Sequence, residues 1–335
     1  MKPLILALLL ASGLAADQEA ERLQAAFNFL QQGKVQQAVG ECKTVLAANP
    51  RSGPAHMLLG QAYLAKGDIA MAAEAKAELQ QAIALDPSLI WARFYLARIY
   101  IDLGLDEKAK EQLERGLKDR PNVPHFLSLL GEVDRKLGNP AASVELNRRA
   151  LAIDASLTPA HYYIGLAELD LKQEDAAVGE IESAVRSQYV TPEMYVALAD
   201  LYGKRKRLAE AEELCRKAIA LDPSRPTSYV SLARIYNTRR ENDKALEALR
   251  RALPEGTQFP ASRFYARLQA DICFEQGVAY EDKGMAAQSI EAYERALEFD
   301  SRRGEAHRRL AELYLKRGDG ARAREHAVEA EKLAK

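Results

Sequence analysis

Hydrophobic positions in this chain follow helical spacing and recur in a fixed register. Five segments place Leu before Gly or Ala and then Tyr three residues later. They are Leu59-Gly60-x-x-Tyr63, Leu96-Ala97-x-x-Tyr100, Leu198-Ala199-x-x-Tyr202, Leu232-Ala233-x-x-Tyr236 and Leu310-Ala311-x-x-Tyr314. Ala199 and Ala233 are 34 residues apart, and so are Gly131 and Gly165. A fixed period of this length predicts an array in which one pair of helices recurs.

The second half of each repeat contains an alanine at one equivalent position. These residues are Ala109, Ala177, Ala211, Ala245 and Ala323. Small side chains let two helix backbones approach closely, so the alanines predict the point where the two helices of a repeat cross. The tripeptides Leu85-Asp86-Pro87 and Leu221-Asp222-Pro223 each close a helical stretch.

These residues resemble the tetratricopeptide repeat (TPR), whose period and Leu-Gly-x-x-Tyr…Ala…Ala…Pro pattern they match. The resemblance implies an all-α fold, an α-solenoid built as a right-handed superhelix of about nine helix-turn-helix repeats. One hairpin cannot bury its apolar stripe alone, so neighbouring repeats supply the missing surface. We place the repeats, numbered one to nine, at residues 19–52, 53–89, 90–123, 124–157, 158–191, 192–225, 226–259, 270–303 and 304–335.

Repeats two and eight depart from the regular spacing. Repeat two has three extra residues within Met71–Gln80, which predicts a kink or register shift in its second helix. Residues 260–269 separate repeats seven and eight, and Pro260 suits the first turn of a helix. We therefore expect this segment to extend the next helix towards its N-terminus.

Other repeats differ in residue type. Repeats four and five have Asp134 and Glu168 where Tyr is usual, and repeat five has Lys172 in place of the turn glycine. The last helix is not followed by a polar capping helix, which solenoids usually need. Self-association through this C-terminal repeat is therefore one expectation.

The first sixteen residues have the pattern of a secretory signal peptide. One positive charge, Lys2, precedes an apolar run, and small residues follow before Asp17. Cleavage after Ala15 fits better than cleavage after Ala16. The run is shorter than the ~20 residues of a membrane-spanning helix, so no integral membrane span is expected. The pattern predicts export to the periplasm or beyond, and an apolar helix packed on repeat one is the alternative.

Charge and motifs argue against several functions. The chain has 47 Lys and Arg against 48 Asp and Glu, so it lacks the basic field that holds a nucleic-acid backbone. It contains no G-x-G-x-x-G, G-x-x-x-x-G-K-[ST], H-E-x-x-H or G-x-S-x-G motif. We therefore expect no enzymatic activity, no cofactor and no metal site.

The histidines and cysteines fit packing positions. His56, His161 and His307 are each fourth in a first helix, where the family has a bulky core residue, while His125 and His326 are isolated surface or groove residues. Three cysteines are too few for a disulfide framework. We expect Cys42, Cys215 and Cys273 to be buried free thiols.

The resemblance also indicates which residues face a groove. Positions two, five, nine and twelve of the first helix usually point into the concave surface of a TPR array. The candidate groove residues are Met57, Gln61, Trp91, Phe94, Arg98, Ile101, Tyr162, Leu166 and Arg234. Trp91 is the foremost candidate, because Trp is enriched at binding hot spots, and the two arginines could pair with a peptide carboxylate. Alternatively, Trp91 and Phe94 pack against repeat two.

The expected function is that of a non-enzymatic scaffold that holds a peptide or a partner helix in its groove. The chain lacks the Lys/Asn pair of the TPR adaptors that clamp acidic chaperone tails, and it lacks the Asn ladder of TPR glycosyltransferases. A role in cell-envelope assembly, secretion or polysaccharide systems follows by analogy alone. A chaperone-like binder of many clients and a small-ligand carrier or enzyme are the alternatives.

Overall fold

The computed structural model describes residues 14–66, 71–254, 257 and 263–334. Within these ranges the chain forms helices and no strand, which confirms the predicted all-α class. The helices are α2 (Leu14–Gln31), α3 (Val35–Ala48), α4 (Gly53–Ala65), α5 (Ala72–Leu85), α6 (Ile90–Asp102), α7 (Asp106–Asp119), α8 (Pro124–Lys136), α9 (Pro140–Ile153), α10 (Thr158–Asp170), α11 (Glu174–Val185), α12 (Pro192–Lys204), α13 (Leu208–Leu221), α14 (Pro226–Thr238), α15 (Asn242–Ala252), α16 (Arg263–Asp282), α17 (Ala286–Phe299), α18 (Gly304–Lys316) and α19 (Gly320–Ala334).

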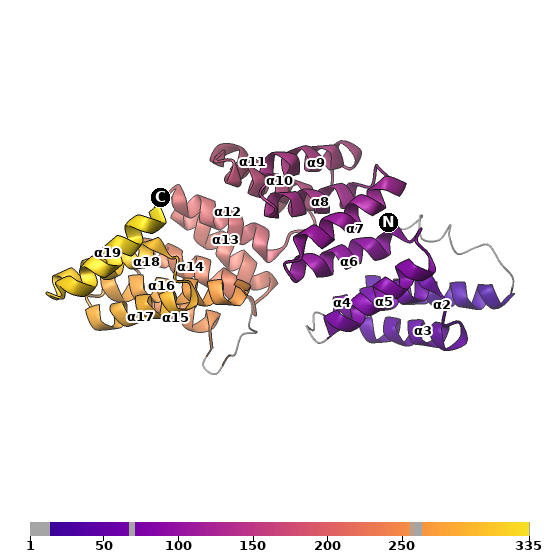
Figure 1. The fold of residues 1–335 in the computed structure, drawn as a ribbon, viewed down its shortest axis with the longest axis horizontal. Coiled ribbons are helices and arrows are strands. Elements are labelled where there is room, and N and C mark those ends of the chain that lie inside the picture. Colours follow the sequence, from indigo (N-terminus) through magenta and orange to yellow (C-terminus); the bar gives the residue numbers. More distant parts are fainter. Residues whose placement is uncertain (1–13, 67–70, 255–256, 258–262, 335) are drawn as a thin grey trace. The chain divides into compact units, whose positions relative to one another are not determined.

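Within each of the two compact units described below, successive helices pair as hairpins, and the hairpins stack (Figure 1). The second helix of one hairpin also packs against the first helix of the next, as α5 does on α6 and α7 on α8. Each apolar stripe is thereby covered on two sides, which is the packing of an α-solenoid. Helices α5 and α13 end at Leu85 and Leu221, where the Leu-Asp-Pro tripeptides predict an end.

The chain divides into two compact units, an N-terminal unit (Met1–Ala177) and a C-terminal unit (Val178–Lys335). In the N-terminal unit the first helices α2, α4 and α6 lie side by side, and α8 lies beside α10. In the C-terminal unit α12, α14 and α16 are neighbours in the same way. The first helices thus form one layer of each unit and the second helices form the other.

The crossing point of each hairpin depends on small residues, as the sequence predicts. All five alanines of the repeat pattern are buried, four of them with no exposed surface. In repeat two a Cβ on Gly60 would lie 2.7 Å from Cγ of Leu79, and in repeat eight a Cβ on Gly277 would lie 2.5 Å from two ring carbons of Tyr293. The helices therefore cross so closely that a methyl group would not fit at these two glycines.

The turn between the two helices of a repeat needs one residue in the left-handed region. Gly104 has this conformation in repeat three, but Lys172, Lys206 and Arg240 have it in repeats five to seven, with φ near 60°. In repeat six the N–H of Arg207 donates to the carbonyl of Tyr202 at 2.9 Å across this turn. A side chain in this conformation costs roughly 1–2 kcal/mol, so these three turns are strained.

Polar contacts join several second helices to the next first helix. In repeat six the Tyr202 hydroxyl donates to Glu182 at 2.7 Å, and in repeat nine Tyr314 donates to Glu294 in the same way. In repeat four the contact is reversed, because Lys110 on α7 donates to the buried Asp134 on α8 at 2.8 Å. In repeat five Arg148 lies 3.7 Å from Glu168. In repeats four and five the first helix therefore supplies the acid, whereas in repeats six and nine the preceding second helix supplies it.

The extra residues of repeat two lie between its helices. Helix α5 has 14 residues, as α7 and α13 do, and residues 66–71 separate it from α4. The predicted kink in the second helix is therefore wrong. Three residues inside a helix would rotate its apolar face by about 60° relative to whole turns. With the insertion outside the helix, Ala75, Leu79 and Ala82 stay fully buried.

The segment before repeat eight and the N-terminus bear on the remaining expectations. Residues 263–269 are helical and continuous with repeat eight, while Pro260 lies outside the described residues. At the N-terminus α2 begins at Leu14 and passes through Ala15 and Ala16; residues 1–13 lie outside the described part. None of the described helices is both long and apolar enough to cross a membrane.

Candidate peptide-binding site

Helix α6 leaves one stripe of its surface only partly covered: Arg98 is exposed, and the other three residues of the stripe are half-buried. Trp91, Phe94, Arg98 and Ile101 lie on this stripe, at i, i+3, i+7 and i+10, and only Asp102 among the other residues of α6 is not buried. The spacing puts all four on one helix face. They are the four residues that the repeat pattern assigns to the groove in repeat three. The core of α6 is complete without them, since Tyr95, Leu96 and Tyr100 are buried on the other faces.

The aromatic residues of the stripe form a cluster with α8. The Trp91 ring packs edge-on against Phe94, His125 and Phe126, with centroid distances of 5.3–5.8 Å. Phe126 is fully buried, whereas Trp91 and Phe94 are half-buried. The ring contacts of Trp91 are to its own helix and to repeat four, and Trp91 and Phe94 also pack against the hydrophobic cluster that contains Met57 and Leu79 of repeat two. These contacts hold the indole ring in a fixed orientation.

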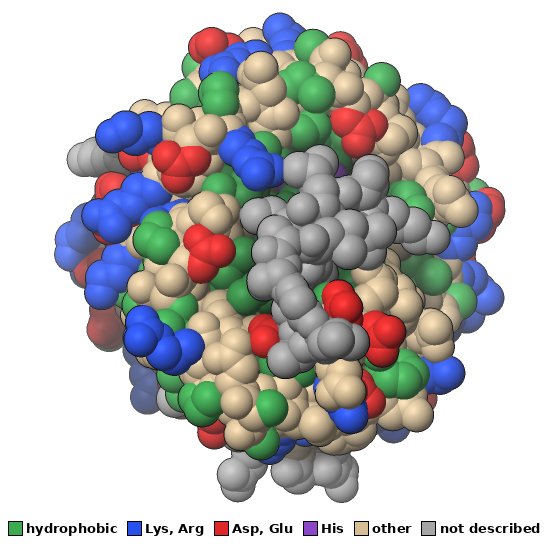
Figure 2. Space-filling view, turned by 90° about the vertical axis from the view of Figure 1, so that its right-hand side faces the viewer, with side chains coloured by type: hydrophobic (Ala, Val, Ile, Leu, Met, Phe, Trp, Pro, Cys, Tyr) green, Lys and Arg blue, Asp and Glu red, His purple; other side chains and the backbone are tan. Residues whose placement is uncertain are grey.

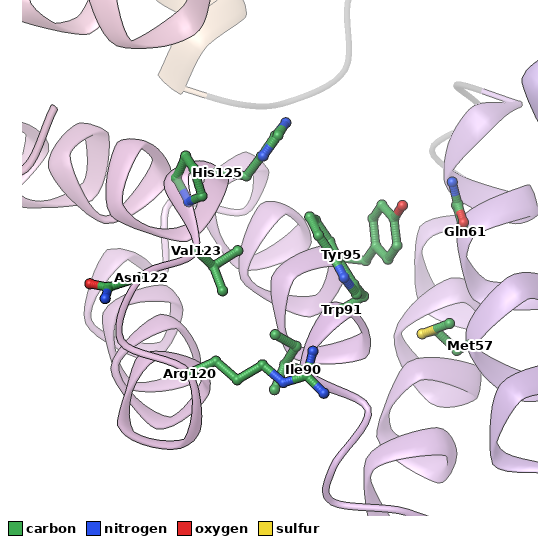
Figure 3. Close-up of a pocket in the computed structure, with 10 residues that line it drawn as sticks. Met57, Gln61, Ile90, Trp91, Tyr95, Arg120, Asn122, Val123 and His125 are labelled. Carbon is green, nitrogen blue, oxygen red and sulfur yellow. The ribbon is translucent and has the colours of Figure 1, made fainter. Parts of the chain in front are cut away.

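A pocket of about 230 Å³ opens beside Trp91 (Figure 3). Met57 and Gln61 of α4 lie on one side of it, and Trp91 and Tyr95 of α6 lie on the other. The connection between α7 and α8 and the first residues of α8 complete the lining. The remaining lining residues are Ile90, Arg120, Asn122, Val123, Pro124 and His125.

Besides the Tyr95 hydroxyl and the Trp91 indole, the polar groups of the pocket are amides, an imidazole and one guanidinium. Gln61, Asn122, His125 and Arg120 supply them, and the lining contains no Asp or Glu. Burial lowers the pKa of His125, which favours the neutral imidazole. Arg120 is half-buried and forms no ion pair with the described residues. The pocket is therefore largely apolar with a single positive charge at its edge.

The other predicted groove residues lie outside this pocket. Tyr162 and Leu166 are half-buried on α10, and the Tyr162 ring packs against Tyr163 at 5.8 Å. Burial raises the pKa of Tyr162 to about 12, so its hydroxyl is neutral at physiological pH. Arg98 and Ile101 belong to the α6 stripe, and Arg98 is the exposed member.

Arg234 belongs to the C-terminal unit and already has partners. Its guanidinium lies 3.1 Å from Asp200 and 3.0 Å from the buried Glu275. Asn237 donates a further hydrogen bond to Glu275 at 2.9 Å. The Arg234 guanidinium, which the sequence predicts as a partner for a peptide carboxylate, is therefore already paired with two carboxylates of the chain.

The histidines of the repeats are held by polar contacts. His56 and His307 each place Nε2 3.1 Å from a carbonyl oxygen six residues earlier, and Tyr229 donates to the equivalent carbonyl at 2.9 Å. Core packing is confirmed for His307, whereas His56 and His161 are half-buried. The expectation that His326 is isolated is wrong: its Nδ1 lies 2.9 Å from Nδ1 of His307, and its ring stacks on Tyr314.

The three cysteines are buried and free, as the sequence predicts. Burial raises the pKa of Cys42 and Cys215 to about 12 and also raises that of Cys273. In the described part of the chain, no three His, Cys, Asp or Glu residues are grouped so that they could bind a metal.

On the face that Figure 2 presents, Lys and Arg side chains are interspersed with Asp and Glu.

Comparison with known families agrees with the geometry of the hairpins. Four family profiles, each described as a tetratricopeptide repeat, match residues 23–90 and 162–226, 71–133 and 204–272, 270–302, and 304–329. The chain is a tetratricopeptide repeat protein. Residues 134–161 lie in none of the matched segments, and they include Asp134, one of the two acids that replace the usual tyrosine.

Individual TPR proteins are similar to this one at low identity. Tetratricopeptide repeat protein 21B of Xenopus laevis is 28% identical over 138 residues, which are 39% of this chain and 10% of that protein. This chain thus spans about a tenth of that relative's length. A chain in the crystal structure of the APC/C hetero-tetramer Cut9-Hcn1 superimposes with a TM-score of 0.57 and 12% identity, with 94% of this chain and 93% of that chain covered. A TPR protein from Parabacteroides merdae superimposes with the same TM-score and 18% identity, covering 78% and 99%.

These structural similarities establish the TPR fold. TPR arrays are generally non-enzymatic scaffolds for protein–protein interaction, so a protein or peptide is the kind of partner that the fold implies. The pocket beside Trp91 is one place in this TPR protein where such a partner could anchor.

Proposed function

We propose that this TPR protein is a scaffold that binds a segment of a partner protein along the first helices of its N-terminal unit. The observation behind this proposal is the α6 stripe, where Trp91, Phe94 and Ile101 are half-buried and Arg98 is exposed. Trp and Arg are enriched among residues that dominate binding energy. Half-buried aromatic rings on a fixed helix lose little entropy when a partner covers them.

The neighbouring surface supports a site for an extended or helical segment. The pocket lies between α4 and α6, and Tyr162 and Leu166 on α10 are half-buried. A partner segment that contacts α4, α6 and α10 would bury several side chains at once. The Cut9-Hcn1 structure is, by its title, a hetero-tetramer, which is consistent with TPR chains that bind other proteins.

We also propose that the protein is exported and works in a bacterial cell envelope, within an assembly, secretion or polysaccharide system. This proposal is based on the charge, apolar run and small residues within residues 1–16. The mature N-terminus, determined by mass spectrometry of protein from the periplasmic fraction, tests it. A first residue at 16 or 17 supports export, and an intact Met1 in the cytoplasmic fraction contradicts it.

The binding proposal is tested with a triple variant and a library of random twelve-residue peptides displayed on phage. The variant Trp91→Ala, Phe94→Ala and Tyr162→Ala should retain its helicity by circular dichroism and lose the peptides that wild type enriches. A matched control replaces three exposed apolar residues off the stripe by Ala. They are Leu103, Tyr189 and Leu221, which are 56%, 72% and 54% exposed.

Three outcomes separate the alternatives. Peptides that bind wild type and the control, but not the triple variant, support the site. Peptides that bind all three proteins equally would place binding elsewhere. Enrichment that depends on the site but yields no consensus sequence would favour a chaperone-like binder of many clients.

A further inference from the structure

We infer that the pocket beside Trp91 accepts one aromatic side chain of the partner segment, and that Arg120 binds a carboxylate on the residue next to it. This inference rests on the proposed function and adds the chemistry of the partner. It follows from the size of the pocket, from its walls and from an unusual charge at its edge.

The size of the pocket suits a single side chain. Its volume of about 230 Å³ is below the roughly 300 Å³ at which small-molecule sites begin. The opening lies on the same side of α6 as the partly exposed stripe, since Trp91 belongs to both. A peptide lying along the stripe can therefore insert one residue here without changing its course.

The walls of the pocket favour an aromatic ring over an aliphatic chain. Trp91 and Tyr95 present ring surfaces on one side, and the Met57 thioether faces them from α4 (Figure 3). Trp91 already makes three edge-on contacts with neighbouring rings. One more ring would continue this arrangement, and sulfur–aromatic contacts are also favourable.

The charge at the edge of the pocket stands where four other second helices have an acid, while α3 and α15 have Asn49 and Leu253 as C-cap residues. Helices α5, α9, α13 and α17 end with Asp86, Asp154, Asp222 and Asp300 as C-cap residues. In each case the carboxylate accepts a hydrogen bond from the backbone N–H two residues later. Helix α7 ends instead with Arg120, whose C-cap backbone angles are like those of the four aspartates.

Arg120 therefore replaces a turn-stabilising acid by a base at the one C-cap that lines this pocket. Some other arginines of the N-terminal unit are paired with acids, such as Arg135 with Asp170 at 2.8 Å and Arg115 with Glu111 at 2.6 Å. Arg120 has no such partner among the described residues, and no acid lines the pocket. A carboxylate of the ligand would supply the missing partner, with a geometry that guanidinium groups favour. Since consecutive residues are about 3.8 Å apart, an acid beside the inserted ring can reach the rim.

The test uses the peptides that wild type enriches from the random library. One such peptide is synthesised with its aromatic residue changed to Ala, and again with the adjacent Asp or Glu changed to the amide. Affinities are measured from the fluorescence of Trp91, which is the single Trp of the chain. The measurements are repeated with Arg120→Gln, and with Lys118→Gln as a control that removes an exposed charge of α7 outside the pocket lining.

We expect enriched peptides to contain an aromatic residue next to an acid. The change to Ala should abolish measurable binding, and the change to the amide should weaken it roughly three- to fivefold, as expected for a partly exposed ion pair. In Arg120→Gln the acid and the amide should bind within about twofold of each other, while Lys118→Gln should behave as wild type.

Two other outcomes have different meanings. Peptides that need Trp91, Phe94 and Tyr162 but lack the aromatic–acid pair would overturn this inference and leave the proposed function in place. The same conclusion would follow if the loss on amidation were unchanged in Arg120→Gln. If no peptide distinguishes wild type from the triple variant, both the inference and the proposed function are wrong.

Discussion

The close crossing of α16 and α17 makes a strong prediction about stability. A Cβ added to Gly277 would lie 2.5 Å from both Cδ1 and Cε1 of Tyr293. That ring cannot easily move away, because Tyr293 is fully buried and its hydroxyl donates to Glu281 at 2.9 Å. Phe274 packs against the same ring with centroids 5.4 Å apart. Gly277→Ala should therefore destabilise the C-terminal unit.

The size of this effect follows from two opposed contributions. Overpacking costs roughly 1–3 kcal/mol, and a ring fixed on several sides places the cost near the upper value. Alanine is favoured over glycine in a helix by up to about 1 kcal/mol. The net loss should be about 2 kcal/mol. With a denaturant dependence of about 2 kcal/mol per molar urea, the unfolding midpoint should fall by about 1 M.

A matched substitution should have the opposite sign. Gly179 lies within α11, and a Cβ at this position would meet nothing within 4 Å. Gly179→Ala should gain only the preference of Ala over Gly for a helix, which increases the free energy of unfolding by up to about 1 kcal/mol. The urea midpoint should therefore rise. Both variants are compared with wild type by urea unfolding followed by circular dichroism. A Gly277→Ala protein as stable as wild type would refute the reasoning about the crossing point.

Three further predictions concern other parts of the chain. Lys206→Gly should raise the melting temperature slightly, because it removes left-handed strain of about 1 kcal/mol, whereas Lys204→Gly in helix α12 should lower it; a decrease in both would contradict the strain. Burial lowers the pKa of His326, so the unfolded chain binds more protons and stability should fall as the pH drops below about 6.5. Thermal melts from pH 8 to 5 should show this loss, and His326→Gln should reduce it. Because burial raises the pKa of Cys42 and Cys215 to about 12, Ellman's reagent at pH 8 should react with the cysteines only after denaturation, and rapid reaction of the native protein would refute their burial.

Much of the fold is predictable from the sequence because small and aromatic residues recur with the 34-residue period of the repeats. Helices α4, α6 and α8 begin at residues 53, 90 and 124, where the repeats are placed. The insertion in repeat two is harder to place, because the residue types around it favour a helix as much as those of the helix that follows. Packing decides the matter, since Leu79 must stay opposite Gly60.

Pairwise contacts between helices are less visible in the sequence. The exchange of acid and base at Asp134 and Lys110 is seen only when both helices are known to touch. The contact between His307 and His326 is similar, because the two residues are 19 positions apart on different helices. A one-dimensional pattern identifies each position but not its partner across the hairpin.

Part of the candidate site is likewise predictable from the sequence and part is not. The α6 stripe follows from repeat positions alone, and in the structure its residues are half-buried except for the exposed Arg98. Arg120 escapes the same reasoning because it lies in a connection between repeats. Alignment of the helix ends would have revealed it, since four of the equivalent residues, 86, 154, 222 and 300, are Asp.

The central claim is that the layer of first helices, rather than the layer of second helices, contacts the partner. A photo-crosslinking amino acid placed at Gln61 reports on the pocket, and the same group at the exposed Lys108 of α7 reports on the second helices. Illumination in living cells, followed by mass spectrometry, identifies the crosslinked segment. We predict one recurring partner segment from position 61 that is absent from position 108. Equal crosslinking from both positions, or none from position 61, would contradict the account.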